Sequence, residues 1–290
     1  MTNRIQCLKD GFVELIDYMP KSDDSRTIEI AIVTAARTST TQDMEKQVKS
    51  EKEDKALIRY LYRNQHTSPF EMIVFKFCVK CPIFIARQWM RHRTAAYNEF
   101  SGRYSEFSDE YYDPTEMTDE ICPGGGIRFQ DASLTGNKQG SSKEGGKEIT
   151  PEIIDKFETI NRSVDTIFEV YHSLIKDDGI SKETARYPLP VSTWTQFYFQ
   201  MNLHNLLHFI SLRMDSHAQP EIQVYAKAIY DLISPLVPTV IECFNNFTLN
   251  SMTLSEIEIK AINRKNITLI ENLRERKEFQ EKLKLLGIDF

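Results

Sequence analysis

Residues 73–93 pass from the hydrophobic period of a strand to that of a helix without a linker. From Ile73 to Lys80 the odd positions are apolar, as in a half-buried strand. Pro82 then stands where the first turn of a helix tolerates proline, and the helix continues from Ile83 to about Arg93. The β-branched run at 28–33 predicts another strand. Because strands and helices do not alternate strictly, we expect an α+β fold in which a mixed sheet packs with long helices.

Signals at their ends delimit the predicted helices. Ser50 and Glu53 form a capping box for a helix that ends near Asn64. Residues 150–152 begin the longest helix, whose apolar stripe is expected in the core and which ends at 177–179. We expect further helices at 181–186, at 202–213 after a mixed aromatic and polar stretch at 193–201, and from Pro220 onward.

Composition limits how the chain is organised. With 290 residues, of which 41% are hydrophobic, it can bury a substantial core. Residues 112–150 are rich in glycine and poor in large apolar side chains, which predicts a flexible insertion. Gly124–Gly126 is not a phosphate loop, because no Gly-Lys-Ser/Thr follows it. We expect a single catalytic domain over 1–250 that contains this insertion, and a charged, helix-like extension over 251–290.

The sequence favours a soluble protein of the cytoplasm. No apolar run approaches the length of about 18 residues typical of a membrane span, and the N-terminus has no signal-peptide pattern. The chain has only five cysteines, an odd number, which argues against a disulfide framework and indicates a reducing compartment. Cys78 and Cys81 form a Cys-x-x-Cys pair, but the chain has no second pair to complete a zinc site.

Positive charge is concentrated at residues 87–105. This segment holds four arginines, one histidine and one glutamate, in a chain of formal net charge -6. Arginines four apart often only solvate a helix face. However, Arg91-His92-Arg93 is followed after seven residues by Ser101-Gly102-Arg103, where glycine allows close backbone approach to a phosphate and the flanking side chains donate to its oxygens. The segment therefore predicts an anion-binding site.

Neither a nucleophilic role for Ser101 nor a metal site at His204 and His208 is well supported by the sequence. Ser101 could act as a nucleophile, but no histidine or lysine near it in sequence is placed to take its proton. His204 and His208 are four apart on one helix and could bind a metal, but no glutamate follows His204 and no third ligand is evident. We therefore expect binding at Ser101 and no metal site.

The segment resembles the signature of the flavin-dependent thymidylate synthases. Two further blocks support the resemblance, one at 66–71 and one, Leu-Arg-x-Asp-Ser-His-Ala-Gln, at 212–219. The likeness covers about residues 28–104 and 184–235. In the arginine segment the agreement extends over Gln88, Arg91, His92, Arg93, Asn98, Glu99, Ser101, Gly102, Arg103 and Tyr104.

The resemblance implies a set of site residues. It implies catalytic roles for Arg213, placed against the uracil ring, and for His66. It places Arg186 on the nucleotide phosphate of a neighbouring subunit. The implied residues for deoxyuridine monophosphate (dUMP) are Gln88, Arg91, Glu99, Ser101, Gly102, Arg103, Arg186 and Arg213. The implied flavin residues are Ser39, His66, Ser68, Glu71, Arg91, His92, Arg93, Asn98, Glu99, Asn202, His204 and His208, although some members carry Arg and Asn in place of the two last histidines.

The implied reaction is reductive methylation of dUMP to dTMP. Methylenetetrahydrofolate would donate the carbon, FAD would carry it and supply hydride, and NADPH would re-reduce the flavin. The implied assembly is a homotetramer whose active sites are shared between subunits. No enzyme nucleophile is required, which agrees with the absence of a cysteine in an arginine- or histidine-rich setting.

Two rival functions remain open at this point. A nucleic-acid-binding protein could use the arginines together with Trp89, Tyr97, Phe100 and Tyr104 as stacking groups, but the acidic net charge argues against a polymer ligand. A flavoprotein of the same fold could act on a different nucleotide. We expect small-molecule substrates and neither a nucleic-acid polymer nor a membrane as partner.

Overall fold

The computed structural model describes residues 3–21, 28–41, 43, 49–116, 129–130, 146–147 and 150–289. It divides into two compact units, Met1–Ile241 and Glu242–Phe290. Within the predicted insertion it places the 3-10 helix η2 (Pro114–Glu116) and the short pair β5 (Phe129–Gln130) and β6 (Gly146–Lys147), and Gly124–Gly126 lies outside the described residues. None of the helices in the described ranges combines the length and apolar character needed to cross a membrane.

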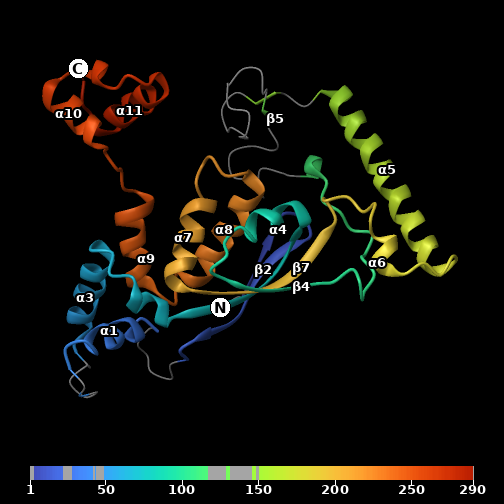
Figure 1. Cartoon of the computed structure of the whole chain (residues 1–290), viewed down its shortest axis with the longest axis horizontal. Coiled ribbons are helices and arrows are strands. Elements are labelled where there is room, and N and C mark those ends of the chain that lie inside the picture. Colours follow the sequence, from blue (N-terminus) through green and yellow to red (C-terminus); the bar gives the residue numbers. More distant parts are fainter. Residues whose placement is uncertain are drawn as a thin grey trace. The chain divides into compact units, whose positions relative to one another are not determined.

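The first unit is built on a five-stranded sheet of order β1-β2-β3-β7-β4 (Figure 1). The α+β class is confirmed, but every strand pair of this sheet is antiparallel, so the expected mixed sheet is wrong. The short turn between the first two strands makes a hairpin, and no parallel crossover is present among the paired strands. The strands are β1 (Arg4–Cys7), β2 (Gly11–Met19), β3 (Val74–Pro82), β4 (Ala96–Glu99) and β7 (Trp194–Asn202).

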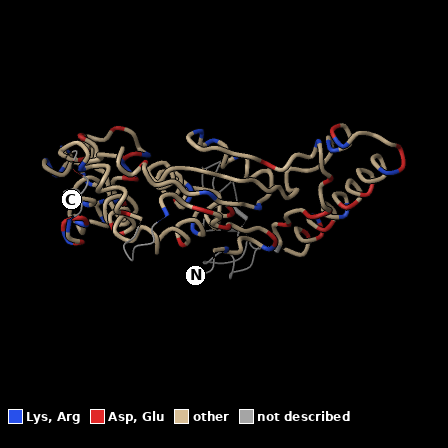
Figure 2. The backbone as a smooth tube through the Cα atoms, turned by 90° about the horizontal axis from the view of Figure 1, so that it is seen from below, with Lys and Arg blue, Asp and Glu red and all other residues tan. Residues whose placement is uncertain are grey.

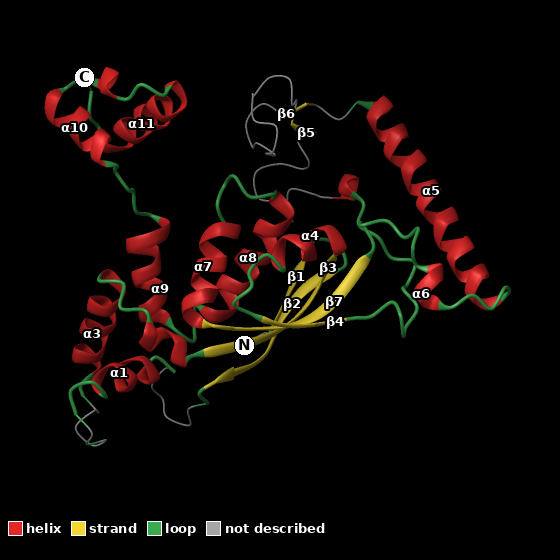
Figure 3. Ribbon diagram, viewed as in Figure 1, coloured by secondary structure: helices red, strands yellow, loops and turns green. Residues whose placement is uncertain are grey.

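Three helices cover one face of this sheet, as Figure 3 shows. They are α4 (Ile83–Trp89), α7 (Leu203–Arg213) and α8 (Pro220–Ile233). Trp89 is fully buried at their meeting point, with its ring centroid 5.5 Å from that of Phe199 on β7 and 4.8 Å from that of Phe209 on α7. Along β7 the alternate residues Tyr198 and Gln200 are exposed on the opposite face.

The predicted strand at 28–33 is wrong, because these residues lead into helix α1 (Ile30–Arg37). Ile32 and Val33 are buried on one side of this helix, and tertiary packing of this kind overrides the β-propensity of branched residues. The buried carboxylate of Glu29 fixes the start of the helix by accepting a hydrogen bond from the Val240 amide at 2.7 Å.

Local end signals are confirmed in α3 (Glu51–Arg63). The Ser50 hydroxyl accepts from the Glu53 amide, the Glu53 carboxylate accepts from the Ser50 amide, and Asn64 ends the helix. A short 3-10 helix, η1 (Ser68–Met72), connects α3 to the sheet and packs against both α1 and α7.

The longest helix, α5 (Pro151–Lys176), also begins and ends as predicted, with the Thr150 hydroxyl as its cap. Its apolar stripe is buried only in the second half, at Val164, Phe168 and Tyr171, whereas Ile160 is 54% exposed. Acidic side chains recur along the helix (Figure 2). The short helix α6 (Lys182–Ala185) follows at the predicted place.

The second unit has a small core of its own. Helix α9 (Pro238–Phe244) and the π-helical turn η3 (Asn245–Leu249) lead to α10 (Glu256–Arg264), η4 (Ile267–Leu269) and α11 (Leu273–Leu286). The core residues are Ala261, Ile270, Phe279 and Leu283. No predicted site residue lies in this unit.

A pair of substitutions on β7 tests this layered arrangement. Phe199→Ala removes a fully buried ring and should lower the free energy of unfolding by about 3–5 kcal/mol. The adjacent Gln200→Ala, on the exposed face, should change it by only about 0.5 kcal/mol. Urea unfolding of both variants measures the difference, and equal effects would contradict the assignment of the two faces.

Candidate active site

Arg213 at the end of α7 is held by two groups from a distant part of the chain. Its Nε donates to His92 Nε2 at 3.0 Å across 121 residues of sequence, and its Nη2 donates to the Gln88 carbonyl at 2.9 Å. Both partners belong to the end of α4 and the turn that follows it. The structure therefore brings together Gln88, His92 and Arg213, three of the predicted site residues.

The imidazole of His92 is neutral in this arrangement. Burial, followed by the electrostatic influence of Arg213 and His208, lowers the pKa of His92 from 6.5 to about 4. Because Nε2 accepts a hydrogen bond from Arg213, the ring proton lies on Nδ1. The ring packs against Phe209 at a centroid distance of 4.8 Å and faces His208 at 6.3 Å. The Arg213 guanidinium thus has a neutral neighbour and keeps its full charge.

Tyr97 fixes the turn that carries His92. Its hydroxyl is shared between the carbonyls of His92, at 2.9 Å, and Trp89, at 3.1 Å. Burial raises the pKa of Tyr97 to about 12, so the phenol remains a donor at neutral pH. These contacts satisfy carbonyls at the end of α4, which explains why the helix ends at Trp89 instead of near Arg93 as predicted.

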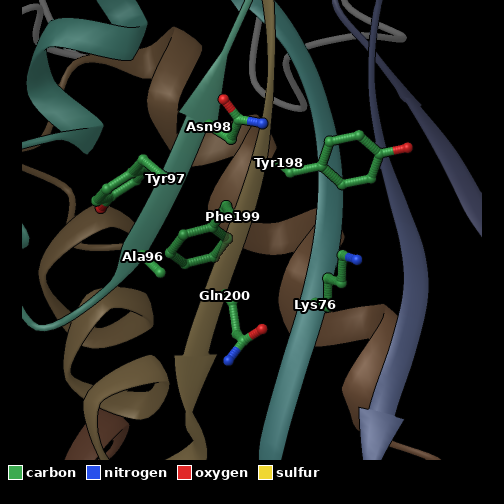
Figure 4. Close-up of a pocket in the computed structure, with 7 residues that line it drawn as sticks. All are labelled: Lys76, Ala96, Tyr97, Asn98, Tyr198, Phe199 and Gln200. Carbon is green, nitrogen blue, oxygen red and sulfur yellow. The ribbon is translucent and has the colours of Figure 1, made fainter.

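The predicted loop after the arginines contains a short edge strand, β4, which pairs with β7. Glu99 at its end accepts a hydrogen bond from the buried Thr195 hydroxyl at 2.8 Å. Asn98, the preceding residue, points to the opposite face of the sheet from Tyr97 (Figure 4). Asn98 is therefore not part of the cluster around Arg213.

Asn98 instead lines a shallow pocket of about 390 Å³ on the outer face of the sheet (Figure 4). The polar side chains drawn there point in different directions and do not converge on one spot. The lining residues are Lys76, Ala96, Tyr97, Asn98, Tyr198, Phe199 and Gln200, and none is an arginine. The pocket lining shares Tyr97 with the residues that hold the His92 turn but does not include Gln88, His92 or Arg213.

Ser101, Gly102 and Arg103 form a tight turn directly after β4. The Ser101 carbonyl accepts from the amides of Tyr104 and Ser105 at 3.0 and 3.1 Å. An added Cβ at 102 would stand only 2.2 Å from Cε2 of Phe107, so any other residue there would displace that ring. The Arg103 Nε lies 3.1 Å from a Glu183 oxygen in α6, next to the Arg186 segment.

The other basic residues of the segment face solvent. Arg91 and Arg93 are exposed and have no ion-pair partner among the described residues, so both are available to an anionic ligand. Arg186 ends α6 and is half-buried. Arg91 and Arg93 thus offer solvent-accessible guanidinium groups, which suit a phosphate-bearing ligand.

Gln219 belongs to the cluster and was missed by sequence reasoning. Its side-chain oxygen accepts from the side-chain amide Nε2 of Gln88 at 2.5 Å, which connects α4 to the start of α8. The signal was present, because Gln219 closes the Ser-His-Ala-Gln block whose arginine was recognised.

The remaining predicted flavin residues gather around η1 and the start of α7. Leu203 donates its amide to the Ile73 carbonyl at 2.8 Å, which joins the segment of Ser68 and Glu71 to α7. Asn202 caps α7 by accepting from the Asn205 amide at 2.9 Å. Helix α7 carries His204 and His208 toward Arg213. Ser39 lies in the turn after α1, and the exposed His66 follows α3 with its ring edge against Tyr60.

The described residues contain no group of histidine, cysteine, aspartate or glutamate side chains arranged to hold a metal ion. Cys78 and Cys81 are free and buried. Burial raises the pKa of both thiols, which keeps them protonated at neutral pH. In this part of the chain, neither thiol is placed to act as a nucleophile.

The chain is similar in sequence to proteins of one family. Residues 14–239 match the family model described as thymidylate synthase complementing protein. The chain is 43% identical to a flavin-dependent thymidylate synthase of Dictyostelium discoideum, over 95% of this chain and 85% of that protein. It is 41% identical to one of Wolbachia pipientis, over 96% and 90% of the two chains.

Among solved structures, the chain is similar to the UMP/dUMP methylase PolB of Streptomyces cacaoi bound with 5-Br dUMP. The two share 33% identity with a TM-score of 0.69, over 84% of this chain and 98% of that one. The same methylase is also known with 5-Br UMP, with a TM-score of 0.63.

The neutral state of His92 predicts how stability depends on pH. Because its folded pKa lies below its unfolded value, the unfolded chain binds the proton first as the pH falls from about 6.5 toward 4, and the folded state loses stability. Replacing His92 by Gln should reduce this loss, as measured by urea unfolding across that range. His66→Gln, at an exposed histidine, should retain the original slope. An unchanged slope in the His92 variant would contradict a neutral, buried imidazole.

Proposed function

Because the chain belongs to the flavin-dependent thymidylate synthases, we propose that it methylates dUMP to dTMP with methylenetetrahydrofolate as carbon donor and NADPH as reductant. When bound, FAD supplies the carrier and hydride chemistry of this reaction. The chain itself supplies binding sites, orientation and charge.

The observation that carries the proposal is the fixed guanidinium of Arg213. Two of its nitrogens are engaged by His92 and by the Gln88 carbonyl, while Nη1 has no hydrogen-bond partner among the described residues. A preoriented cation stabilises negative charge that develops on the pyrimidine when its carbon becomes a nucleophile. The neutral imidazole beside it leaves this charge available, and Arg213 is the proposed catalytic residue.

The nucleotide phosphate is proposed to bind at the turn of Ser101, Gly102 and Arg103. The hydroxyl, the backbone and the guanidinium of this turn all offer donors, and exposed Arg91 adds another. Arg186 is proposed to act on the nucleotide of a neighbouring subunit. Gln88 and Glu99 lie on the helical side of β4 with Arg213 and are proposed to contact the nucleoside.

FAD is proposed to bind along α7, and the side chains present there fit it. Helix α7 has 11 residues and is about 16 Å long, so groups at its two ends can hold separate parts of an extended dinucleotide. The donors are hydroxyl, amide, imidazole and guanidinium groups, as a pyrophosphate and a flavin ring require. The proposed residues are Ser39, His66, Ser68, Glu71, Arg91, His92, Arg93, Glu99, Asn202, His204 and His208, with His66 also proposed as catalytic. Asn98, on the outer face of the sheet, is proposed to contact the FAD of another copy.

We further propose a homotetramer with shared active sites, located in the cytoplasm. Large apolar side chains are exposed in the segments that carry the proposed phosphate residues, with Tyr104 at 75%, Tyr187 at 84% and Val191 at 63% exposure. Exposed aromatic surface of this kind is typical of interfaces between subunits. The buried free thiols of Cys7, Cys78 and Cys81 suit a reducing compartment.

A second candidate is methylation of UMP, because the structurally similar PolB is known with both the deoxy and the ribo nucleotide. Assays with dUMP and UMP in parallel separate the two substrates. The nucleic-acid-binding alternative is disfavoured by the net charge of -6.

The absorbance spectrum of the purified protein tests the proposal. We expect oxidised flavin bands that bleach with NADPH and respond to added dUMP. Arg213→Ala should then lower thymidylate formation by at least about 10²-fold, as expected for loss of one transition-state donor, while flavin remains bound. Arg264→Ala, at an exposed arginine of the second unit, should retain activity. Full turnover without Arg213 would remove it from this role.

A further inference from the structure

One aromatic ring packs against the phosphate turn, which we define as Ser101, Gly102 and Arg103. The ring of Phe107 lies so close to Gly102 that no Cβ fits between them. The same ring stands edge-on to Phe100 at a centroid distance of 5.0 Å. Phe100 in turn donates its amide to the Gln196 carbonyl of β7 at 2.8 Å. One side of the turn is therefore attached to the sheet, and the other depends on where Phe107 sits.

Phe107 is placed by Tyr171 of helix α5. The Phe107 amide donates to the Tyr171 hydroxyl at 3.1 Å, and Tyr171 is fully buried. Burial raises the pKa of Tyr171, so its oxygen stays a neutral hydroxyl and a stable acceptor at neutral pH. A buried hydroxyl with one backbone partner fixes the position of that backbone more narrowly than apolar packing alone.

The segment after Phe107 is fastened to α5 along its length. His172 Nε2 lies 2.5 Å from Asp109, and Asn161 donates to Asp113 at 2.6 Å. Tyr111 donates its hydroxyl to Asp165 at 3.1 Å. Because these contacts hold the rest of the segment in place, the Tyr171 bond can be removed without detaching the segment from the helix.

Tyr171 also belongs to the core that places the second arginine segment. The buried cluster of Val164, Phe168, Tyr171 and Ala185 includes the residue directly before Arg186. The α5 helix thus supports both Arg103, through Phe107, and Arg186, through Ala185. The Arg103 guanidinium and Glu183 of α6 complete this connection at 3.1 Å.

We propose that Tyr171 is a positioning residue for the nucleotide phosphate: its hydroxyl holds Phe107 against Gly102 and thereby sets the turn that presents Ser101 and Arg103. This rests on the proposed function, in which the phosphate turn binds dUMP. Tyr171 touches neither substrate nor cofactor, and it acts only through Phe107.

Tyr171→Phe in the holoenzyme tests the proposal, because it removes the hydroxyl and keeps the ring. The dissociation constant for dUMP, measured by calorimetry, should rise about tenfold, as expected for loss of one hydrogen bond that orders a binding turn. Flavin content should not change. The KM for dUMP should rise more than kcat falls. Tyr111→Phe is the matched control, since it removes a hydroxyl that contacts Asn161 and Asp165 of α5, and it should retain dUMP affinity.

A double-mutant cycle separates positioning from a general loss of stability. If Tyr171 acts through the turn, Tyr171→Phe should weaken dUMP binding much less in an Arg103→Gln background than in the wild type. Equal effects in the two backgrounds would overturn the proposal. Should Tyr171→Phe fail to fold, Phe107→Leu removes the supporting ring and should give the same loss of affinity, whereas unchanged affinity would again overturn it.

The proposed function and the positioning role of Tyr171 can be contradicted separately. A wild-type protein that does not bind dUMP would sink the proposed function. A wild type that binds dUMP, together with a Tyr171→Phe variant that binds it equally well, would leave the function intact and remove Tyr171 from its positioning role.

Discussion

The packing of Trp89 is the constraint on which the site depends. This side chain ends α4 while fully buried among rings of the sheet and of α7 and α8, so the helix cannot shift without opening the core. Its position fixes where the chain turns, and the turn carries His92. The Gln88 carbonyl, one residue before Trp89, is fixed by the same packing. The hydrogen bonds to Arg213 thus depend on core packing, which holds the Gln88 carbonyl and His92 in position for the charged group.

Two partly buried arginines of the first unit show how the choice of neighbour determines what a guanidinium can do. Arg37 pairs with the carboxylate of Asp54 at 2.6 Å, and this neutralises its charge within the structure. Arg213 instead has a neutral imidazole and a backbone carbonyl as partners. Leaving a partly buried cation without a carboxylate costs free energy, and burial accordingly lowers the pKa of Arg213. An anionic ligand, or charge that develops during a reaction, recovers that cost, which is the physical basis for a catalytic role at this position.

How much the sequence could predict follows from how local each signal is. The capping box at Ser50 and Glu53 and the cap at Thr150 act within one helical turn, and both helix starts were predicted correctly. The sequence analysis does not predict β1 or β2, and it describes β7 only as a mixed aromatic and polar stretch, although the residues of β7 alternate between buried and exposed. Residues 194–202 form a strand because they pair with β3, and the sequence of a strand alone does not reveal its partner. The strand prediction at 28–33 is wrong because tertiary packing overrides the β-propensity of this segment, which leads into helix α1.

The candidate site shows the same limit. The motif identified Gln88, His92 and Arg213 and also contains Gln219, but the contacts of Tyr97 and Gln219 depend on the turn and on the approach of α8, which the motif does not show. It also grouped Asn98 with Glu99, and the two-residue period of β4 sends these neighbours to opposite faces of the sheet. Glu99 thus shares the helical face of the sheet with Arg213, and Asn98 lies on the opposite face. If both residues serve the same kind of site, Asn98 must serve the site of another copy, and this geometry supports the proposal that active sites are shared between subunits.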